Sequence, residues 1–181
     1  DQLRSRPGAA SGPRPADRSQ TRVARPPVAH RDTPATEALR HLVWDRDSIA
    51  DQLDEVLFAD PVVATAYRSL CATSSVADAI DMASADDPVA GDLLQRLAVE
   101  GAESTVTSVL TRLVDDAGTA ALAALQVEAR VSDDPFAVGE AIRWLNLRLM
   151  DLREQESEHS QDMEAMQDLL SWLTGAEHEP S

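Results

Sequence analysis

The chain contains no lysine, a single cysteine and few aromatic residues: three Trp, two Phe and one Tyr among 181 residues. A single thiol, Cys71, excludes an internal disulfide framework and a cysteine-based zinc site, and it suits a reducing, cytoplasmic location. With so few aromatics, the core must be built from Leu, Val, Ile and Ala, which favours packed helices over a sandwich or barrel. No apolar run reaches the roughly 18 residues that a membrane span needs, so we expect no membrane contact.

The motifs of common enzymes are absent as well. The sequence has no P-loop, no Gly-x-Gly-x-x-Gly and no Gly-x-Ser-x-Gly, and its four histidines stand alone. Asp45-Arg46-Asp47 has the Asp-x-Asp form that can hold Mg²⁺, but no Gly-rich loop accompanies it. We therefore interpret Asp47 as a helix cap and expect no metal or cofactor in this segment.

Charge is distributed unevenly along the chain. Residues 1–32 hold seven Arg and three Asp, a net charge of +4, whereas the remaining residues hold nine Arg and 29 acidic residues, a net charge of −20. A body of that charge repels nucleic-acid phosphates, so we expect little direct binding to nucleic acid and a basic or apolar protein partner.

Proline and apolar spacing divide the chain into three parts. Residues 1–32 are rich in Pro and Arg and lack large apolar residues, which predicts a disordered linker. Residues 33–132 are predicted to form a helical bundle and residues 133–181 a C-terminal helical hairpin, an all-α fold. Thr-Pro or Asp-Pro pairs predict helix starts at about 34, 61, 88 and 135. Further helices are expected at about 47–58, after Ser75, and at about 103–131.

The predicted hairpin has a heptad-like apolar seam on each of its helices, over about 135–156 and 160–174, joined by the polar turn 156–160. Trp144 and Trp172 each precede a seam leucine, so they lie beside the seam, where they either fill the core or form an exposed anchor. Trp44 and Cys71 are expected to be buried. If the hairpin is a contact surface, its candidate residues are Trp144, Leu147, Arg148, Asp151, Leu169, Trp172 and Leu173.

Several blocks together resemble the C-terminal region of bacterial DNA primases, best of the actinobacterial type. The similar blocks are Leu39–Val43, Leu53–Pro61, Ala66–Leu70 and Asp92–Glu100, and with the tail the resemblance covers about residues 34–175. It implies a helix bundle followed by a helical hairpin that docks primase onto the hexameric replicative helicase during primer synthesis in DNA replication. The family's zinc domain and its Mg²⁺-dependent Toprim core lie upstream and are missing here. We therefore expect a non-catalytic fragment of a primase.

Three alternatives remain open at this point. The Ile49–Leu70 block also fits the N-terminal collar domain of the replicative helicase itself. A catalytic hypothesis has Asp45 and Asp47 holding metal for nucleotidyl transfer. The third hypothesis is an acidic helical interaction module unrelated to replication, which rests on charge alone.

Overall fold

The computed structural model describes residues 32–131, 134–158 and 163–175, and every regular element in these ranges is helical. The α-helices are α1 (Pro34–Trp44), α2 (Pro61–Ala72), α3 (Val76–Asp86), α4 (Pro88–Leu97), α5 (Val106–Glu128), α6 (Pro135–Glu158) and α7 (Glu164–Leu173). Three 3₁₀ turns, η1 (Arg46–Ser48), η2 (Ala50–Gln52) and η3 (Glu55–Leu57), lie between α1 and α2. The all-α prediction is confirmed. The predicted linker, apart from Asp32, and the end of the polar turn at 156–160 lie outside the described residues.

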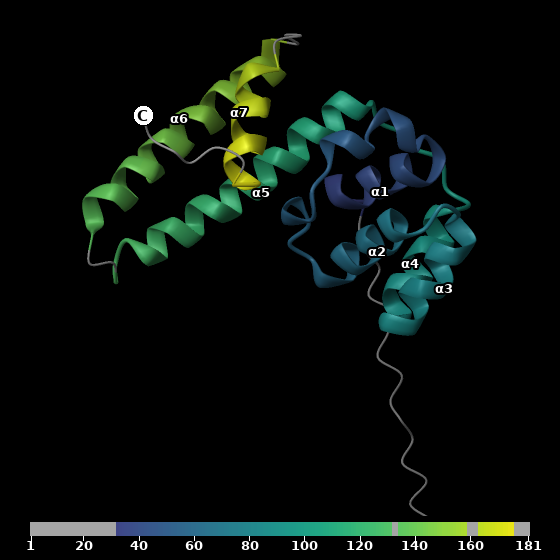
Figure 1. Cartoon of the computed structure of the whole chain (residues 1–181). Helices are drawn as coiled ribbons and strands as arrows, with labels where there is room; N and C mark the ends of the chain where they lie inside the picture. The colour runs from purple at the N-terminus through teal and green to yellow at the C-terminus, as the bar shows by residue number, and fades with distance from the viewer. Residues whose placement is uncertain (1–31, 132–133, 159–162, 176–181) are drawn as a thin grey trace, which may run out of the picture.

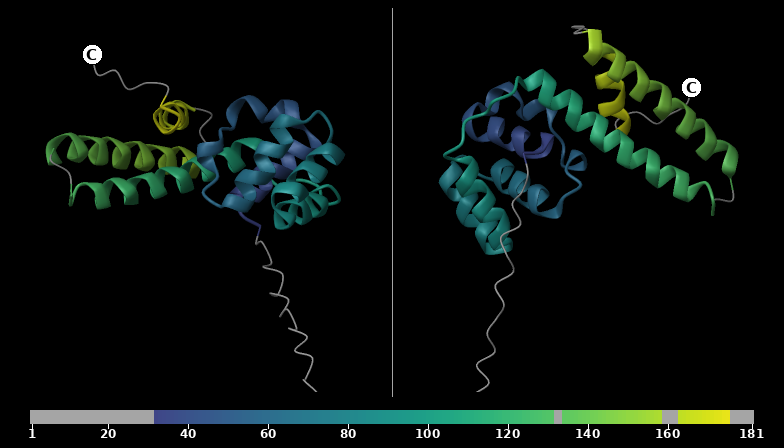
Figure 2. Two further views of the ribbon diagram at one scale, coloured as in Figure 1. Left: turned by 60° about the horizontal axis from the view of Figure 1, so that its bottom comes forward. Right: turned by 180° about the vertical axis from the view of Figure 1, so that it is seen from behind.

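The helices form two parts that share α5 (Figure 1). Helices α1 to α4 and the first half of α5 make a compact body, which we define as residues 32–114. The second half of α5 continues outward beside the antiparallel α6, and α7 packs against both of these helices from one side (Figure 2). We call residues 115–175 the arm. One long helix therefore connects both parts, and the predicted boundary near residue 132 falls at the outer end of the arm.

The predicted helix starts agree with the structure. α1, α2, α4 and α6 begin at the four prolines that follow a Thr or Asp. The carboxylate of Asp60 accepts the Val62 N–H at 2.8 Å, and that of Asp87 accepts the Val89 N–H at 2.8 Å. These side chains satisfy backbone donors that the first turn leaves without a partner, and the proline that follows has no N–H to satisfy.

The predicted helix at 47–58 is wrong, because this segment forms the three 3₁₀ turns instead. The backbone is extended at Leu53 and Asp54, which separates η2 from η3. Asp54 caps η3 by accepting the Val56 N–H at 2.9 Å. A side chain that competes for backbone donors in this way favours a turn over a continuous helix. Ile49, Leu53 and Leu57 still reach the core, whereas Val56, the fourth apolar residue of this predicted helix face, is exposed. Their apolar spacing therefore predicted burial for three of the four residues and the wrong type of helix.

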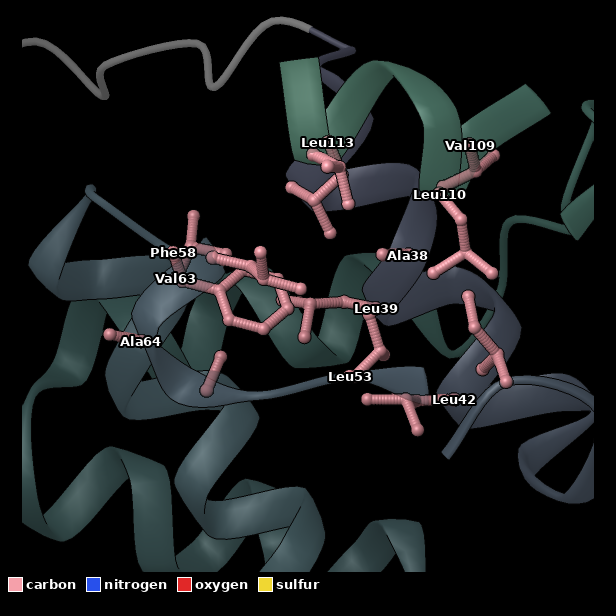
Figure 3. Packing of buried hydrophobic residues seen from close by; sticks show 14 of the residues in the cluster. Ala38, Leu39, Leu42, Leu53, Phe58, Val63, Ala64, Val109, Leu110 and Leu113 are labelled. Atoms are coloured by element: carbon pink, nitrogen blue, oxygen red, sulfur yellow. The ribbon is translucent and has the colours of Figure 1, made fainter. Parts of the chain in front are cut away.

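Aliphatic side chains from distant segments fill the body core (Figure 3). Leu39 of α1 and Leu110 of α5 have no exposed surface, and Phe58 packs its ring 4.7 Å from that of Tyr67. Burying a side chain of this size contributes about 1.5–3 kcal/mol relative to leaving it in water. The core therefore ties α1, α2 and α5 into one unit, from which the arm projects.

The hydrophobic core continues into the arm, where three helices supply its side chains. Leu145, Leu149 and Leu152 of α6 and Ala165, Met166 and Leu169 of α7 are buried, and Ala121, Leu122 and Leu125 of α5 pack against them. The sequence predicted a hairpin of α6 and α7 alone. Two helices with one seam leave much apolar surface in water, and the outer half of α5 covers it.

Within the described residues, no helix combines the length and apolarity needed to cross a bilayer.

Candidate docking surface on the arm

The outward face of α6 carries apolar side chains that no neighbouring helix covers. Leu147 is 55% exposed and Met150 is 55% exposed. They stand three residues apart, between the seam positions Leu145, Leu149 and Leu152, so the helical repeat turns them away from the arm core. Phe136, 86% exposed near the start of α6, lies on the same side of the helix, but the exposed ion pair of Glu140 and Arg143 separates it from Leu147.

Trp144 and Trp172 contact each other across α6 and α7. Their ring centroids are 6.0 Å apart with an interplanar angle of 30°, and both residues are half-buried. An offset aromatic pair of this kind adds about 0.5–1.5 kcal/mol beyond the area that it buries. Each indole therefore has one side packed against the arm and another at the surface, which is intermediate between the two alternatives of core packing and an exposed anchor.

Arg148 links the same two helices one turn further along. Its Nη1 donates to Asp151 Oδ2 at 3.1 Å, and its Nε lies 3.1 Å from Asp168 Oδ2. The pairs 144–172 and 148–168 step in opposite directions along the two helices, which is the register of an antiparallel hairpin. Because these groups are partly exposed, each ion pair contributes no more than about 1 kcal/mol, and their main effect is to fix the register.

The other two candidates lie deeper. Leu169 is completely buried, so it cannot contact a partner, which corrects its assignment to the surface. It occupies the seam of α7 together with Ala165 and Met166. Leu173 is half-buried against the same core. Of the seven predicted contact residues, Leu147 is exposed, and Trp144, Arg148, Asp151, Trp172 and Leu173 are half-buried.

Sequence reasoning missed Met150 and Phe136. The signal for Met150 was available, because it is an apolar residue between two seam positions and three residues beyond Leu147. An apolar residue at such a position faces solvent whenever the seam is buried. No comparable signal marks Phe136 as exposed, since its position in the first turn of α6 is also compatible with packing against α5.

Two residues expected in the core are at the surface of the body. Trp44 is 57% exposed at the end of α1, and Cys71 is exposed near the end of α2. Cys71 directly follows the buried Leu70, so a rotation of about 100° along the helix carries it out of the core. Trp44 is held at the surface because its indole Nε1–H donates to the carbonyl oxygens of Leu97, at the end of α4, and of Glu100, just beyond it.

A partly buried charge cluster joins α1 to the connection between α4 and α5. Arg40, whose side chain is 8% exposed, donates to Asp32 at 2.6 Å, to Glu100 at 2.7 Å and to Glu37. The other carboxylate oxygen of Glu37 accepts the N–H of Glu103 at 2.7 Å and that of Ser104 at 3.1 Å. A pocket of about 110 Å³ lies beside this cluster.

These contacts shift the pKa values of the cluster. Burial by itself raises the pKa of Glu37, but the N–H groups of Glu103 and Ser104 and the guanidinium of Arg40 outweigh it and lower that pKa. The hydrogen bond from Arg40 lowers the pKa of Asp32. Burial opposes the charge on Arg40, but its three carboxylate partners raise its pKa. Asp32, Glu37 and Arg40 are thus stabilised in their charged forms, as expected of a structural network.

The structure does not assemble Asp45 and Asp47 into a metal centre. Asp45 is the residue at the C-terminal cap of α1, Asp47 lies in η1, and both side chains are exposed. Asp47 caps no helix, which corrects that interpretation, because the helix expected to follow it is replaced by η1. Across the described ranges, no group of three or more His, Cys, Asp or Glu residues is arranged to hold a metal ion.

Comparisons of the chain with protein-family models, with curated proteins and with solved structures find no match.

Proposed function

We propose that this chain is a protein-docking module, and that it is the C-terminal region of a bacterial DNA primase that docks onto the hexameric replicative helicase. The observation that carries the docking proposal is the outward face of α6, where Leu147 and Met150 lie in water beside the Trp144–Trp172 pair. The choice of helicase as partner rests on the sequence resemblance given above. A helical body followed by a projecting helical arm is consistent with that resemblance.

The physical properties of this face suit binding. A tryptophan pair held between two helices has already lost most of its side-chain freedom, so little further entropy is lost when a partner covers it. Tryptophan is enriched among residues that carry binding energy, and leucine and methionine around it exclude water. Arg148 fixes the two helices beneath the pair. The arm thus presents a preformed apolar centre with a polar rim.

Charge indicates the character of the partner. The chain carries a net charge of −16, and the arm shares in it through acidic residues on all three helices, among them Asp116, Glu128, Glu140, Glu154 and Glu164. A partner with a basic rim around an apolar groove is electrostatically favoured, whereas nucleic acid is disfavoured. Primer synthesis itself is not proposed for this segment.

The test is size-exclusion chromatography with light scattering of the chain mixed with the hexameric replicative helicase of the same organism. We expect a complex with several copies of the chain per hexamer that persists at moderate salt, because apolar contacts are not screened. Separate peaks at both low and moderate salt would remove the helicase proposal. A complex seen only at low salt would instead favour an acidic module that binds through exposed charge.

Matched variants locate the surface. Leu147→Gln with Met150→Gln removes two exposed apolar groups from α6 without changing the charge, and should weaken binding tenfold to a hundredfold, which is about 1.4–2.8 kcal/mol in total. Met82→Gln with Val89→Gln makes the same chemical change at exposed positions of α3 and α4, and should leave binding unchanged. All four positions are solvent-exposed, so each pair should stay folded. Equal losses in both pairs would contradict the assignment to α6.

A further inference from the structure

The outward face of α6 carries a row of side chains in a symmetric order. The row consists of exposed residues spaced four, three and four positions apart, namely Arg143, Leu147, Met150 and Glu154. This spacing places them along one side of the helix. A cation stands at one end of the row, an anion at the other end and two apolar side chains at the centre. The row is therefore complementary to a reversed copy of itself, as a surface that pairs across a two-fold axis must be.

Neighbouring helices cover both flanks of α6 and leave this row open. On one flank, Arg153 Nε donates to Asp115 Oδ1 of α5 at 2.8 Å. On the other flank, the ring of Trp144 lies 6.0 Å from that of Trp172 in α7. Leu145, on the side of α6 opposite the row, is completely buried. The row is thus held between α5 and α7, and its side chains face solvent in the described structure.

A two-fold axis between Leu147 and Met150 brings opposite charges together. Rotation about this axis sets Leu147 opposite Met150 of the second copy, because the two positions are equally far from the midpoint. It sets Arg143 opposite Glu154 of the second copy for the same reason. Since the symmetry repeats each contact, two antiparallel α6 helices would share two apolar pairs and two ion pairs.

Other arrangements of two α6 helices bring like charges together. Parallel helices in register place Arg143 against Arg143 and Glu154 against Glu154. An axis moved to Leu147 places Glu140 opposite Glu154 of the second copy. Within one chain, Arg143 and Glu140 lie 3.8 Å apart with both side chains highly exposed, so this pair is weak and leaves Arg143 able to bind another carboxylate. The charges therefore favour the antiparallel arrangement centred between Leu147 and Met150.

We propose that two copies of this chain associate through the outward face of α6, with Leu147 and Met150 at the centre and an Arg143–Glu154 ion pair at each end. The row is roughly 16 Å long at 1.5 Å per residue, too short for the usual 800 Å² or so per partner. The dimer is therefore weak, and its population depends on the concentration of the chain. The net charge of −16 opposes association, but physiological salt screens charges more than about 8 Å apart and acts less on ion pairs in contact.

The dimer rests on the docking face proposed above and names a second occupant for it. One face cannot hold two occupants at once, so we expect self-association to compete with docking. The dimer does not depend on the helicase, because its charges and their spacing belong to this chain alone. A test without helicase therefore separates the failure of one proposal from the failure of the other.

The experiment is sedimentation equilibrium of the full chain in roughly 0.15 M salt, from about 10 μM to about 1 mM. For the wild type, we expect the average mass to rise with concentration toward that of two chains. Arg143→Glu and Glu154→Arg should each weaken association about tenfold or more, because each variant dimer contains two like-charged pairs. An equal mixture of the two variants should associate within about threefold of the wild type, because each mixed dimer again contains two pairs of opposite charge. Recovery in the mixture also shows that both variants are folded.

Matched controls separate this pairing from the effect of net charge. Arg143→Glu adds two negative charges and Glu154→Arg removes two, so a general charge effect would weaken association in the first variant and strengthen it in the second. Arg130→Glu and Glu128→Arg make the same changes at exposed positions near the end of α5, and should each change association by less than about twofold. Opposite effects of the two α6 variants, or a mixture that stays monomeric, would overturn the arrangement. A wild-type chain that is monomeric up to about 1 mM would overturn the dimer and leave the face to a different protein.

Discussion

Replacing Gly91 with alanine should destabilise the protein by about 2 kcal/mol, although alanine is the better helix former. Gly91 is buried in α4 where this helix lies against α3. A Cβ atom at Gly91 would clash with Ser84 Oγ and would lie 2.8 Å from Ser84 Cβ and 2.9 Å from Ser84 Cα, distances that real Cβ atoms essentially never show. Because Ser84 Cα belongs to the backbone of α3, the two helices must separate. Overpacking of this kind costs about 3 kcal/mol at the upper end of its usual range, and alanine recovers about 1 kcal/mol of helix propensity.

Two other helical glycines, Gly139 and Gly118, serve as comparison positions for the substitution of Gly91 by alanine. At Gly139 in α6, a Cβ would meet nothing within 4 Å, so Gly139→Ala should stabilise the protein by about 1 kcal/mol. At Gly118 in α5, a Cβ would lie 2.9 Å from Leu149 Cδ2, the end of a flexible side chain. Gly118→Ala should therefore be close to neutral, because a small movement of Leu149 offsets the propensity gain.

The assay is urea unfolding of the full chain followed by circular dichroism at 222 nm. The midpoint should fall for Gly91→Ala and rise for Gly139→Ala, with the slope unchanged. Ser84→Gly removes Oγ and Cβ, two of the three Ser84 atoms that the new Cβ would meet, so a double-mutant cycle with Gly91→Ala should give a favourable coupling of about 1 kcal/mol. If Gly91→Ala were as stable as Gly139→Ala, the close approach of α3 and α4 would be refuted.

Three further predictions concern charge, burial and reactivity. Glu37→Gln should lower the free energy of unfolding by about 2 kcal/mol at pH 7, since it weakens hydrogen bonds to a charged group. Because the pKa of Glu37 is lowered in the folded protein, its stabilising contribution is present above the ordinary pKa of 4.5 and is lost as the pH falls through the folded pKa. The unfolding curves of the variant and the wild type should therefore converge in acid. Leu145→Ala should cost about 3 kcal/mol by leaving a cavity, whereas Leu147→Ala should change the free energy of unfolding by less than about 0.5 kcal/mol, and equal values would contradict the orientation of α6. Cys71 should react with a thiol reagent in the native chain at the rate seen in urea, and strong protection would contradict its exposure.

Local chemistry explains why some elements could be predicted. A Thr or Asp followed by proline can satisfy the first turn of a helix without help from the rest of the chain, so the starts at Pro34, Pro61, Pro88 and Pro135 were readable. The seams of α6 and α7 were readable for a related reason, because helical spacing places their leucines on one face. The prediction of a helix at 47–58 failed, because apolar spacing indicates burial and does not distinguish an α-helix from consecutive 3₁₀ turns.

The candidate site was only partly predictable. The sequence singled out Trp144, Leu147 and Trp172, but it could not show that the two indoles meet at 6.0 Å, because that contact depends on the antiparallel register of α6 and α7. It placed Leu169 on the surface, although this residue of α7 is completely buried. It also placed Trp44 in the core, because an apolar pattern carries no information about hydrogen bonds to a segment more than fifty residues away.

The sequence by itself determined the helical class, most helix starts, the acidic charge and the apolar seams, since each depends on residues within a few positions of one another. Tertiary structure alone decided that α5 belongs to both the body and the arm, that Arg40 is neutralised by carboxylates from three segments, and that Leu147 and Met150 remain in water. These outcomes depend on which helix faces cover one another. That choice is made by packing over the whole chain, where contacts between distant residues compete for the same apolar surface.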